Sequence, residues 1–208
     1  MNISYHLQTS SENTVILYLN DVCEADMVSY VCSLSEYLNK QLLGIIGQSN
    51  IEQAYFLDVI PANNNVTVEY NPLLISFRQV KEKLYQLLND FDFSGANGSE
   101  DEYLKPPIEI PIYYGTEVAL DLEEVAEQLS IRPEQVAELH QKNTYQVAAV
   151  GFAPGFAYLN GLHPALHLPR KSNPRKLVPA GSLAIAEGQT AIYPVSYTHL
   201  RAHETPIN

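Results

Sequence analysis

The feature that most restricts the fold is the density of proline and glycine late in the chain. Residues 151–194 contain six of the 13 prolines and five of the 10 glycines of the 208-residue sequence. Proline fixes φ and glycine permits conformations closed to other residues, so both set the backbone in special φ values. Short apolar runs alternate with them from Thr144 onward. This pattern predicts an all-β barrel with tight turns.

The first half of the chain follows a different pattern, in which strand-like and helix-like segments alternate. Apolar periodicity predicts strands at 14–19, 54–60, 66–70 and 108–113, and helices that begin after Asp21 and Ser76. Glu24 and Gln79 complete a capping-box pattern at the two helix starts. The order β-α-β-β-α-β is typical of a ferredoxin-like α+β domain, with both helices on one face of an antiparallel sheet.

A polar, glycine-rich segment at 94–105, closed by Pro106 and Pro107, predicts a linker. We therefore expect a ferredoxin-like domain at 1–105. A barrel domain follows at 106–195.

The barrel domain is predicted to begin with two short helices. The first, at 121–129, has Asp121 as its expected cap with Glu124 three residues on, and the second, at 133–141, has Pro133 in its first position. Neither helix has a basic face, so we expect an ordinary αα-hairpin rather than a DNA-binding helix-turn-helix.

Composition and charge exclude several function classes. The chain is 46% hydrophobic and has a net charge of −12, which is typical of a folded, acidic protein. Residues 1–150 hold 7 basic and 22 acidic side chains, so nucleic acid is not the expected partner. No apolar run reaches the roughly 18 residues that span a bilayer, and residues 1–11 lack the pattern of a secretory signal.

The two cysteines favour a reducing compartment. Cys23 and Cys32 lie nine residues apart in one predicted helical stretch, too far for a local disulfide. They also lack the C-x-x-C spacing of zinc and redox sites. We expect a cytoplasmic protein with two reduced, core-type thiols.

Residues 151–194 also hold most of the unusual side-chain chemistry. Between Gly151 and Ala186 there is no acidic residue, yet four cations fall within seven residues: Arg170, Lys171, Arg175 and Lys176. Such a cluster suits a carboxylate or phosphate ligand, and the alternative is a solvated or partner-facing loop. Four aromatic residues of the segment are candidates for the apolar wall of a small pocket: Phe152, Phe156, Tyr158 and Tyr193.

Six motifs carry a resemblance to a known family. They are Glu138-Leu139-His140, Gly151-Phe152-x-Pro154-Gly155-Phe156-x-Tyr158-Leu159, Pro169-Arg170, Pro174-Arg175, Val178-Pro179-Ala180-Gly181-Ser182 and Gln189-Thr190-x-Ile192-Tyr193-Pro194. With these motifs the chain resembles the carboxyltransferase-domain subdomain-B family. The family includes the B subunit of bacterial 5-oxoprolinase, the small allophanate-hydrolase-type subunit and the kinase-A inhibitor protein KipI. One departure is Ala191, where the family usually has glycine.

The resemblance implies a ferredoxin-like domain followed by a cyclophilin-like β-barrel. It also implies two partners, a C-type subunit with a related barrel and an A-type subunit. Together they open 5-oxoproline to glutamate with hydrolysis of ATP, which has Mg²⁺ as its usual counter-ion. A lactam carbonyl is a poor electrophile, and phosphorylating its oxygen creates a leaving group for attack by water. Such a site needs Arg or Lys clamps for a carboxylate, a lactam and developing phosphoryl charge, and an aromatic wall that excludes water.

The resemblance also suggests roles for individual residues. Arg170 and Arg175 are expected anion clamps, and His140 is a candidate acid/base or ligand-positioning group. The candidate hydrogen-bonding residues are Ser182, Gln189 and Thr190. Each has a structural alternative: His140 as an imidazolium at a helix end, Ser182 in a turn, and Gln189 with Thr190 in a strand ladder.

Metal and nucleotide motifs are not expected in this chain. His163 and His167 are spaced i,i+4 but lie in a proline-bounded loop without a nearby third ligand, so we expect no metal site. The chain has no G-x-x-x-x-G-K-[ST] sequence, so a P-loop of this chain does not hold the ATP.

The end of the chain departs from the family pattern. The family continues with Pro-Gly-Gly-Trp and further strands, whereas the sequence after Val195 resembles a translated sequencing adapter. We expect residues 196–208 to be a non-native tail and the barrel to be truncated and incomplete. The last native strand would then have an unpaired edge.

Two other functions share these motifs. The chain is alternatively a KipI-like inhibitor of a sensor histidine kinase, which binds without catalysis. Prolyl isomerase activity is suggested by the cyclophilin-like fold alone.

Overall fold

The computed structural model describes residues 3–44, 55–94, 106–173, 175–196 and 203–206. The chain divides into two compact units, residues 1–105 and 106–208, each with buried apolar clusters of its own. No helix in these described ranges is long and apolar enough to cross a membrane.

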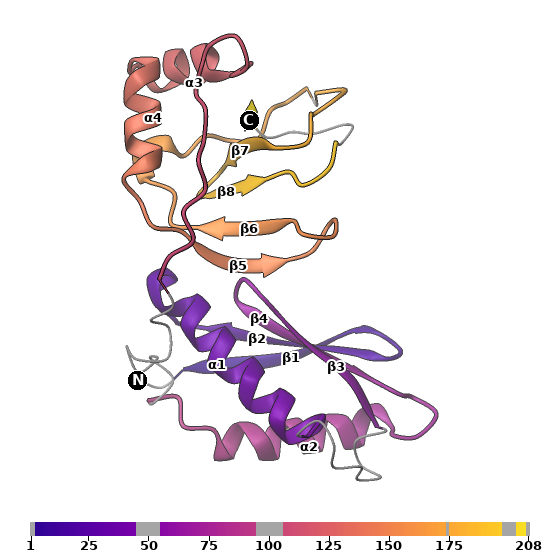
Figure 1. The fold of residues 1–208 in the computed structure, drawn as a ribbon. Helices are drawn as coiled ribbons and strands as arrows, with labels where there is room; N and C mark the ends of the chain where they lie inside the picture. Colours follow the sequence, from indigo (N-terminus) through magenta and orange to yellow (C-terminus); the bar gives the residue numbers. More distant parts are fainter. Residues whose placement is uncertain (1–2, 45–54, 95–105, 174, 197–202, 207–208) are drawn as a thin grey trace. The chain divides into compact units, whose positions relative to one another are not determined.

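The first unit contains a four-stranded antiparallel sheet in the order β1-β2-β4-β3. Its elements are β1 (Ser4–Ser11), β2 (Thr14–Asn20), α1 (Glu24–Leu42), β3 (Phe56–Ala62), β4 (Asn65–Tyr70) and α2 (Phe77–Asp90). Alternate residues of β2 and β4 are buried, as a half-buried strand requires. They share one core with buried residues of both helices, among them Leu34 and Leu84. Both helices therefore pack on one face of the sheet (Figure 1), which confirms the α+β prediction.

The order of elements differs from the prediction at both ends of this region. β1 precedes the predicted first strand, and residues 108–113 are not a strand, so the first unit has the order β-β-α-β-β-α. β1 lacks a sequence signal because its residues are mostly polar and exposed. Segment 108–113 contains Pro111, which lacks a ladder donor, and its Ile108 is 88% exposed.

The predicted N-terminal cap is confirmed for one helix of the first unit and is wrong for the other. The capping box of α2 is confirmed, because Gln79 N donates to Ser76 Oγ over 3.4 Å and Ser76 N donates to Gln79 Oε1 over 3.0 Å. The predicted Asp21 cap of α1 is wrong, because the N-cap residue is Cys23. Asp21 has a φ of +59° and accepts a hydrogen bond from Ser4 instead.

Both cysteines are free thiols, as predicted. Cys32 is half-buried, and burial together with the charge of Glu36 raises the pKa of its thiol. Cys23 is exposed, so its assignment as a core-type thiol is wrong.

The second unit has two helices and a five-stranded antiparallel sheet in the order β5-β6-β8-β7-β9. Its elements are α3 (Leu122–Leu129), α4 (Pro133–Gln141), β5 (Gln146–Val150), β6 (Ala157–Asn160), η2 (Pro164–Leu166), β7 (Ser182–Ala186), β8 (Gln189–Ile192) and β9 (His203–Pro206). Within the described ranges no pairing joins β5 to β9, so this sheet is open. An open antiparallel sheet of short strands fits the predicted incomplete barrel.

The predicted unpaired edge of the last native strand is wrong. β8 lies between β6 and β7, and β7 in turn pairs with β9. The non-native origin of residues 196–208 stays a prediction.

The sheet of the second unit presents two different faces. Side chains alternate along a strand, so cross-strand neighbours share a face. Ile185 and Thr190 are paired and lie on the helix face, where Ile185 packs against residues of α3 and α4 such as Val125 and Val136. Ala184 and Ala191 are paired and lie on the opposite face, which we call the aromatic face.

Candidate functional site

The four predicted pocket aromatics meet on the aromatic face. Phe156 is the centre of the group, with ring centroids 4.8 Å from Tyr158, 4.9 Å from Tyr193 and 5.2 Å from Phe152. The rings of these pairs are inclined by 62° to 71°, an edge-to-face arrangement that aromatic quadrupoles favour. Ala191 belongs to the same cluster, where its methyl group is buried. The departure from the family glycine is therefore accommodated by packing.

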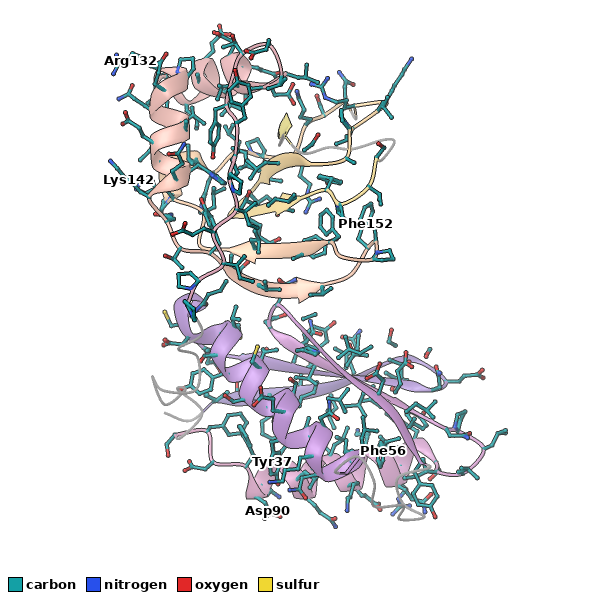
Figure 2. The ribbon with its side chains drawn as sticks, viewed as in Figure 1. Tyr37, Phe56, Asp90, Arg132, Lys142 and Phe152 are labelled. Atoms are coloured by element: carbon teal, nitrogen blue, oxygen red, sulfur yellow. The ribbon has the colours of Figure 1, made fainter. Side chains whose placement is uncertain are left out.

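The aromatic cluster has a buried part and an exposed end. Phe156 and Tyr193 are 3% and 4% exposed, whereas Phe152 is 54% exposed. Figure 2 shows Phe152 at the loop that joins β5 to β6, at the end of these strands away from α4. A ligand on this face would therefore meet the Phe152 ring first.

Ser182 and Gln189 lie on the same face by strand alternation. The Gln189 amide donates to Asn160 Oδ1 over 2.7 Å, so it is held across β6 and β8. Ser182 is fully buried, and its Oγ has no hydrogen-bond partner among the described residues. The backbone of Ser182 accepts a hydrogen bond from Tyr193 N over 2.9 Å. These two candidates thus neighbour the aromatic cluster.

His140 lies on the helix face, in a chain of hydrogen bonds from Tyr114 to the Ala184 carbonyl. Its Nδ1 is 2.8 Å from Tyr114 Oη, and its Nε2 is 3.2 Å from Thr190 Oγ1. Thr190 donates its hydroxyl proton to the carbonyl of Ala184 over 2.9 Å, so it accepts from His140. Nε2 then carries the ring proton, and Nδ1 accepts from the Tyr114 hydroxyl. Both ring nitrogens are satisfied by the protein itself.

The surroundings of His140 keep its imidazole neutral. Burial lowers the pKa of His140 to about 4. The ring also stacks on Tyr145 at a centroid distance of 5.0 Å, and the Tyr145 hydroxyl donates to the His140 carbonyl. The alternative of an imidazolium complementing the helix dipole is therefore wrong at neutral pH.

Two of the four predicted cations, Lys171 and Arg175, are neutralised by acidic residues from α3 and the residue before it. The Asp121 side chain is 3% exposed, and its Oδ1 contacts both Lys171 Nζ, at 2.9 Å, and Arg175 Nη2. Lys171 also lies 2.9 Å from Glu124 Oε2. Burial lowers the pKa of Lys171, but hydrogen bonds to Glu124 and Asp121 outweigh this effect and raise it overall. Asp121 is the N-cap residue of α3, as predicted, but its side chain makes no capping hydrogen bond.

Arg170 has a more open environment than Arg175. Its Nε lies 3.4 Å from Glu187 Oε1, and the two side chains are 55% and 65% exposed. Such an exposed pair is worth little, because water competes for both charges. Arg170 is thus more available to an incoming anion than Arg175, whose side chain is 27% exposed and contacts Asp121.

The structure therefore distributes the predicted site over three places. Phe152, Phe156, Tyr158, Ser182, Gln189 and Tyr193 gather on the aromatic face. His140 and Thr190 lie on the helix face, and Arg170 and Arg175 belong to loops held by acidic partners. The sequence had suggested one site.

Three residues of these networks were missed. Tyr114 and Tyr145 contact His140 from segments without a distinguishing local pattern. Asp121 had a usable signal, because four clustered cations without a nearby acid require a distant counter-charge.

Metal ligation has no support in the described residues, which contain no group of three His, Cys, Asp or Glu side chains that would hold an ion. His163 Nδ1 accepts from Ala165 N over 3.1 Å, and His167 Nε2 donates to the Leu162 carbonyl over 3.1 Å. Both histidines thus have local structural partners.

Comparison with known proteins identifies related sequences. The family described as carboxyltransferase domain, subdomain C and D, matches residues 5–198, so the subdomains are C and D where the motifs had suggested B. The 5-oxoprolinase B subunit of Bacillus subtilis (strain 168) is 35% identical over 180 residues, covering 77% of this chain and 71% of that protein. The 5-oxoprolinase B subunit of Haemophilus influenzae is 37% identical, covering 80% and 76%.

Solved structures show the same fold. The crystal structure of TTHA0988 aligns with a TM-score of 0.68 and 31% identity, covering 93% of this chain. This chain spans only 34% of that protein. The urea carboxylase of Kluyveromyces lactis aligns with a TM-score of 0.68 at 9% identity, over 98% of this chain and 19% of that one. At that identity the likeness concerns the fold alone.

Proposed function

We propose that this chain, which belongs to the carboxyltransferase-domain subdomain C and D family, is the B subunit of an ATP-dependent 5-oxoprolinase. The observation that carries the proposal is the similarity to proteins named as 5-oxoprolinase B subunits, at 35% and 37% identity over most of the chain. The reaction is the opening of the cyclic amide to glutamate, carried out with C-type and A-type subunits. The complex belongs in the cytoplasm, where ATP is available.

The aromatic face is the proposed surface for the substrate ring. A small lactam has an apolar ring and polar edges, so it suits an aromatic wall with a few hydrogen-bonding groups. Phe152 supplies an exposed aromatic surface, and Gln189 supplies an amide fixed by Asn160. These features support binding and orientation of the ring by this chain.

Arg170 is the proposed clamp for the substrate carboxylate. Its guanidinium is largely exposed and only weakly paired with Glu187. A carboxylate that accepts two parallel hydrogen bonds from guanidinium competes well with such a pair. Arg175 instead acts as a structural partner of Asp121.

His140 is a proposed positioning residue rather than a proton donor to substrate. Both its ring nitrogens are engaged by Tyr114 and Thr190. Thr190 precedes Ala191 in β8, so the network fixes the strand whose other face carries the aromatic cluster.

Two of the clustered cations, Lys171 and Arg175, are not free to bind a nucleoside triphosphate. Lys171 and Arg175 are already neutralised by Asp121 and Glu124, and the sequence contains no P-loop. Bound ATP with Mg²⁺ would therefore be held by another member of the complex.

The test is reconstitution of the complex with C-type and A-type subunits. We expect ATP hydrolysis that depends on added 5-oxoproline, and an Arg170→Gln variant with a raised KM for 5-oxoproline. Arg132→Gln, an exposed arginine at the start of α4, is the matched control and should behave like wild type. An assembled complex that hydrolyses ATP equally with and without 5-oxoproline would contradict the proposal. The kinase-inhibitor alternative gains no support from the relatives described above.

A further inference from the structure

Phe152 has an unusual backbone conformation for its residue type. Its φ is +68°, and the other non-glycine residues with positive φ in the described chain are Asp21, Asn63, Ser130 and Glu187. A positive φ is uncommon for any side chain and is a real outlier for a bulky one, because Cβ crowds the backbone. Glycine adopts this conformation without that penalty.

Hydrogen bonds define the turn that holds Phe152. Ala153 N donates to the Gly151 carbonyl over 2.8 Å, which makes Phe152 the central residue of a γ-turn. A γ-turn with positive φ at its centre is the rare and strained form. The turn is braced further, because Gly151 N donates to the Phe156 carbonyl over 3.2 Å and Phe156 N to the Ala153 carbonyl over 3.0 Å.

The strain is not explained by burial of the ring. Phe152 is 54% exposed, so about half of its apolar surface stays in water. Its ring meets the cluster edge-on, 5.2 Å from Phe156 and 6.4 Å from Tyr193. Backbone strain at a residue that stays half exposed is typical of residues placed for function.

We propose that Phe152 is a specificity-determining residue, held by the strained γ-turn so that its exposed ring packs against the ring of a small cyclic amide. This inference rests on the proposed function, and it adds which side chain selects the ring. The braced turn fixes the aromatic ring before the substrate arrives, so little entropy is lost on binding. Replacement of Phe152 by glycine should therefore weaken substrate binding, because the ring is lost, and relieve strain, because Cβ is lost.

The test compares Phe152→Gly with wild type in the reconstituted complex. We expect KM for 5-oxoproline to rise about tenfold with a smaller change in kcat, since one aromatic contact is lost. We also expect the thermal midpoint of the chain to stay equal or rise, because glycine relieves the positive φ. Ser130→Gly relieves a positive φ at the exposed end of α3, outside the site, and should leave KM unchanged.

The possible results distinguish failure of the role of Phe152 from failure of the proposed function. An unchanged KM in Phe152→Gly, with an active wild-type complex, overturns this inference alone. A lowered thermal midpoint together with a fall in kcat would show that the ring is structural, which also overturns it. A wild-type complex without 5-oxoproline-dependent turnover overturns the proposed function and this inference with it.

Discussion

His140 shows how the surroundings of a single residue decide its chemistry. Its sequence position, in the last turn of a helix, is compatible with either a charged or a neutral ring. In the fold the ring is 4% exposed and lies between the Tyr114 and Thr190 hydroxyls, with Tyr145 stacked on it. Because the two nitrogens need one donor and one acceptor, the network requires the neutral form.

This environment predicts a stability that depends on pH. The folded pKa of His140 is lowered to about 4 from an ordinary 6.5, so the unfolded chain binds the extra proton between these values. The stabilisation is fully present above pH 6.5 and is lost as the pH falls toward 4, by about 3 kcal/mol in total. Urea titrations at several pH values measure it. His140→Gln should flatten this slope, whereas the exposed His6→Gln should retain it, and an equal slope in all three proteins would contradict the prediction.

The start of helix α3 is bound by a loop that contains Lys171 and Arg175. Asp121 directly precedes α3 and forms ion pairs with Lys171 and Arg175, which lie about 50 residues later in the chain. The contact connects α3 to the segment that precedes β7. Its buried carboxylate and two cations are mutually compensated, so the removal of one partner leaves the others uncompensated.

Asp121→Asn should therefore destabilise the fold by about 3 kcal/mol. Glu124→Gln is the matched control, because the Glu124 side chain is 48% exposed and contacts the same lysine. Its loss should cost less than about 1 kcal/mol, since water screens exposed pairs. Chemical denaturation of both variants measures the difference. Equal effects of the two substitutions would show that burial of the Asp121 carboxylate is not the decisive factor.

The second unit as a whole has an open sheet, and apolar side chains lie at its surface. Val150 of β5 is 64% exposed, and Ile108 in the segment before α3 is 88% exposed. Exposed apolar side chains become a binding surface where another protein covers them together. Under the proposed function, that protein is the C-type subunit with its related barrel.

We predict that the chain alone does not turn over 5-oxoproline and that the C-type subunit stabilises it. A partner that binds only the folded state raises the thermal midpoint with its concentration. Thermal unfolding with increasing amounts of the C-type subunit measures this rise, and an unrelated protein of equal net charge serves as the control. A midpoint that is independent of the C-type subunit would contradict the prediction.

The sequence by itself determined the α+β class, the short strands of the second unit and the bounds of helices such as α4, at 133–141 in both prediction and structure. These features depend on local periodicity, proline and glycine, which act within a few residues. It could not determine β1, whose polar residues are a strand because β2 pairs with them. Nor could it show that the candidate residues lie on two faces of one sheet and in ion pairs with Asp121. Contacts between residues distant in the chain depend on register and packing, which only the tertiary structure decides.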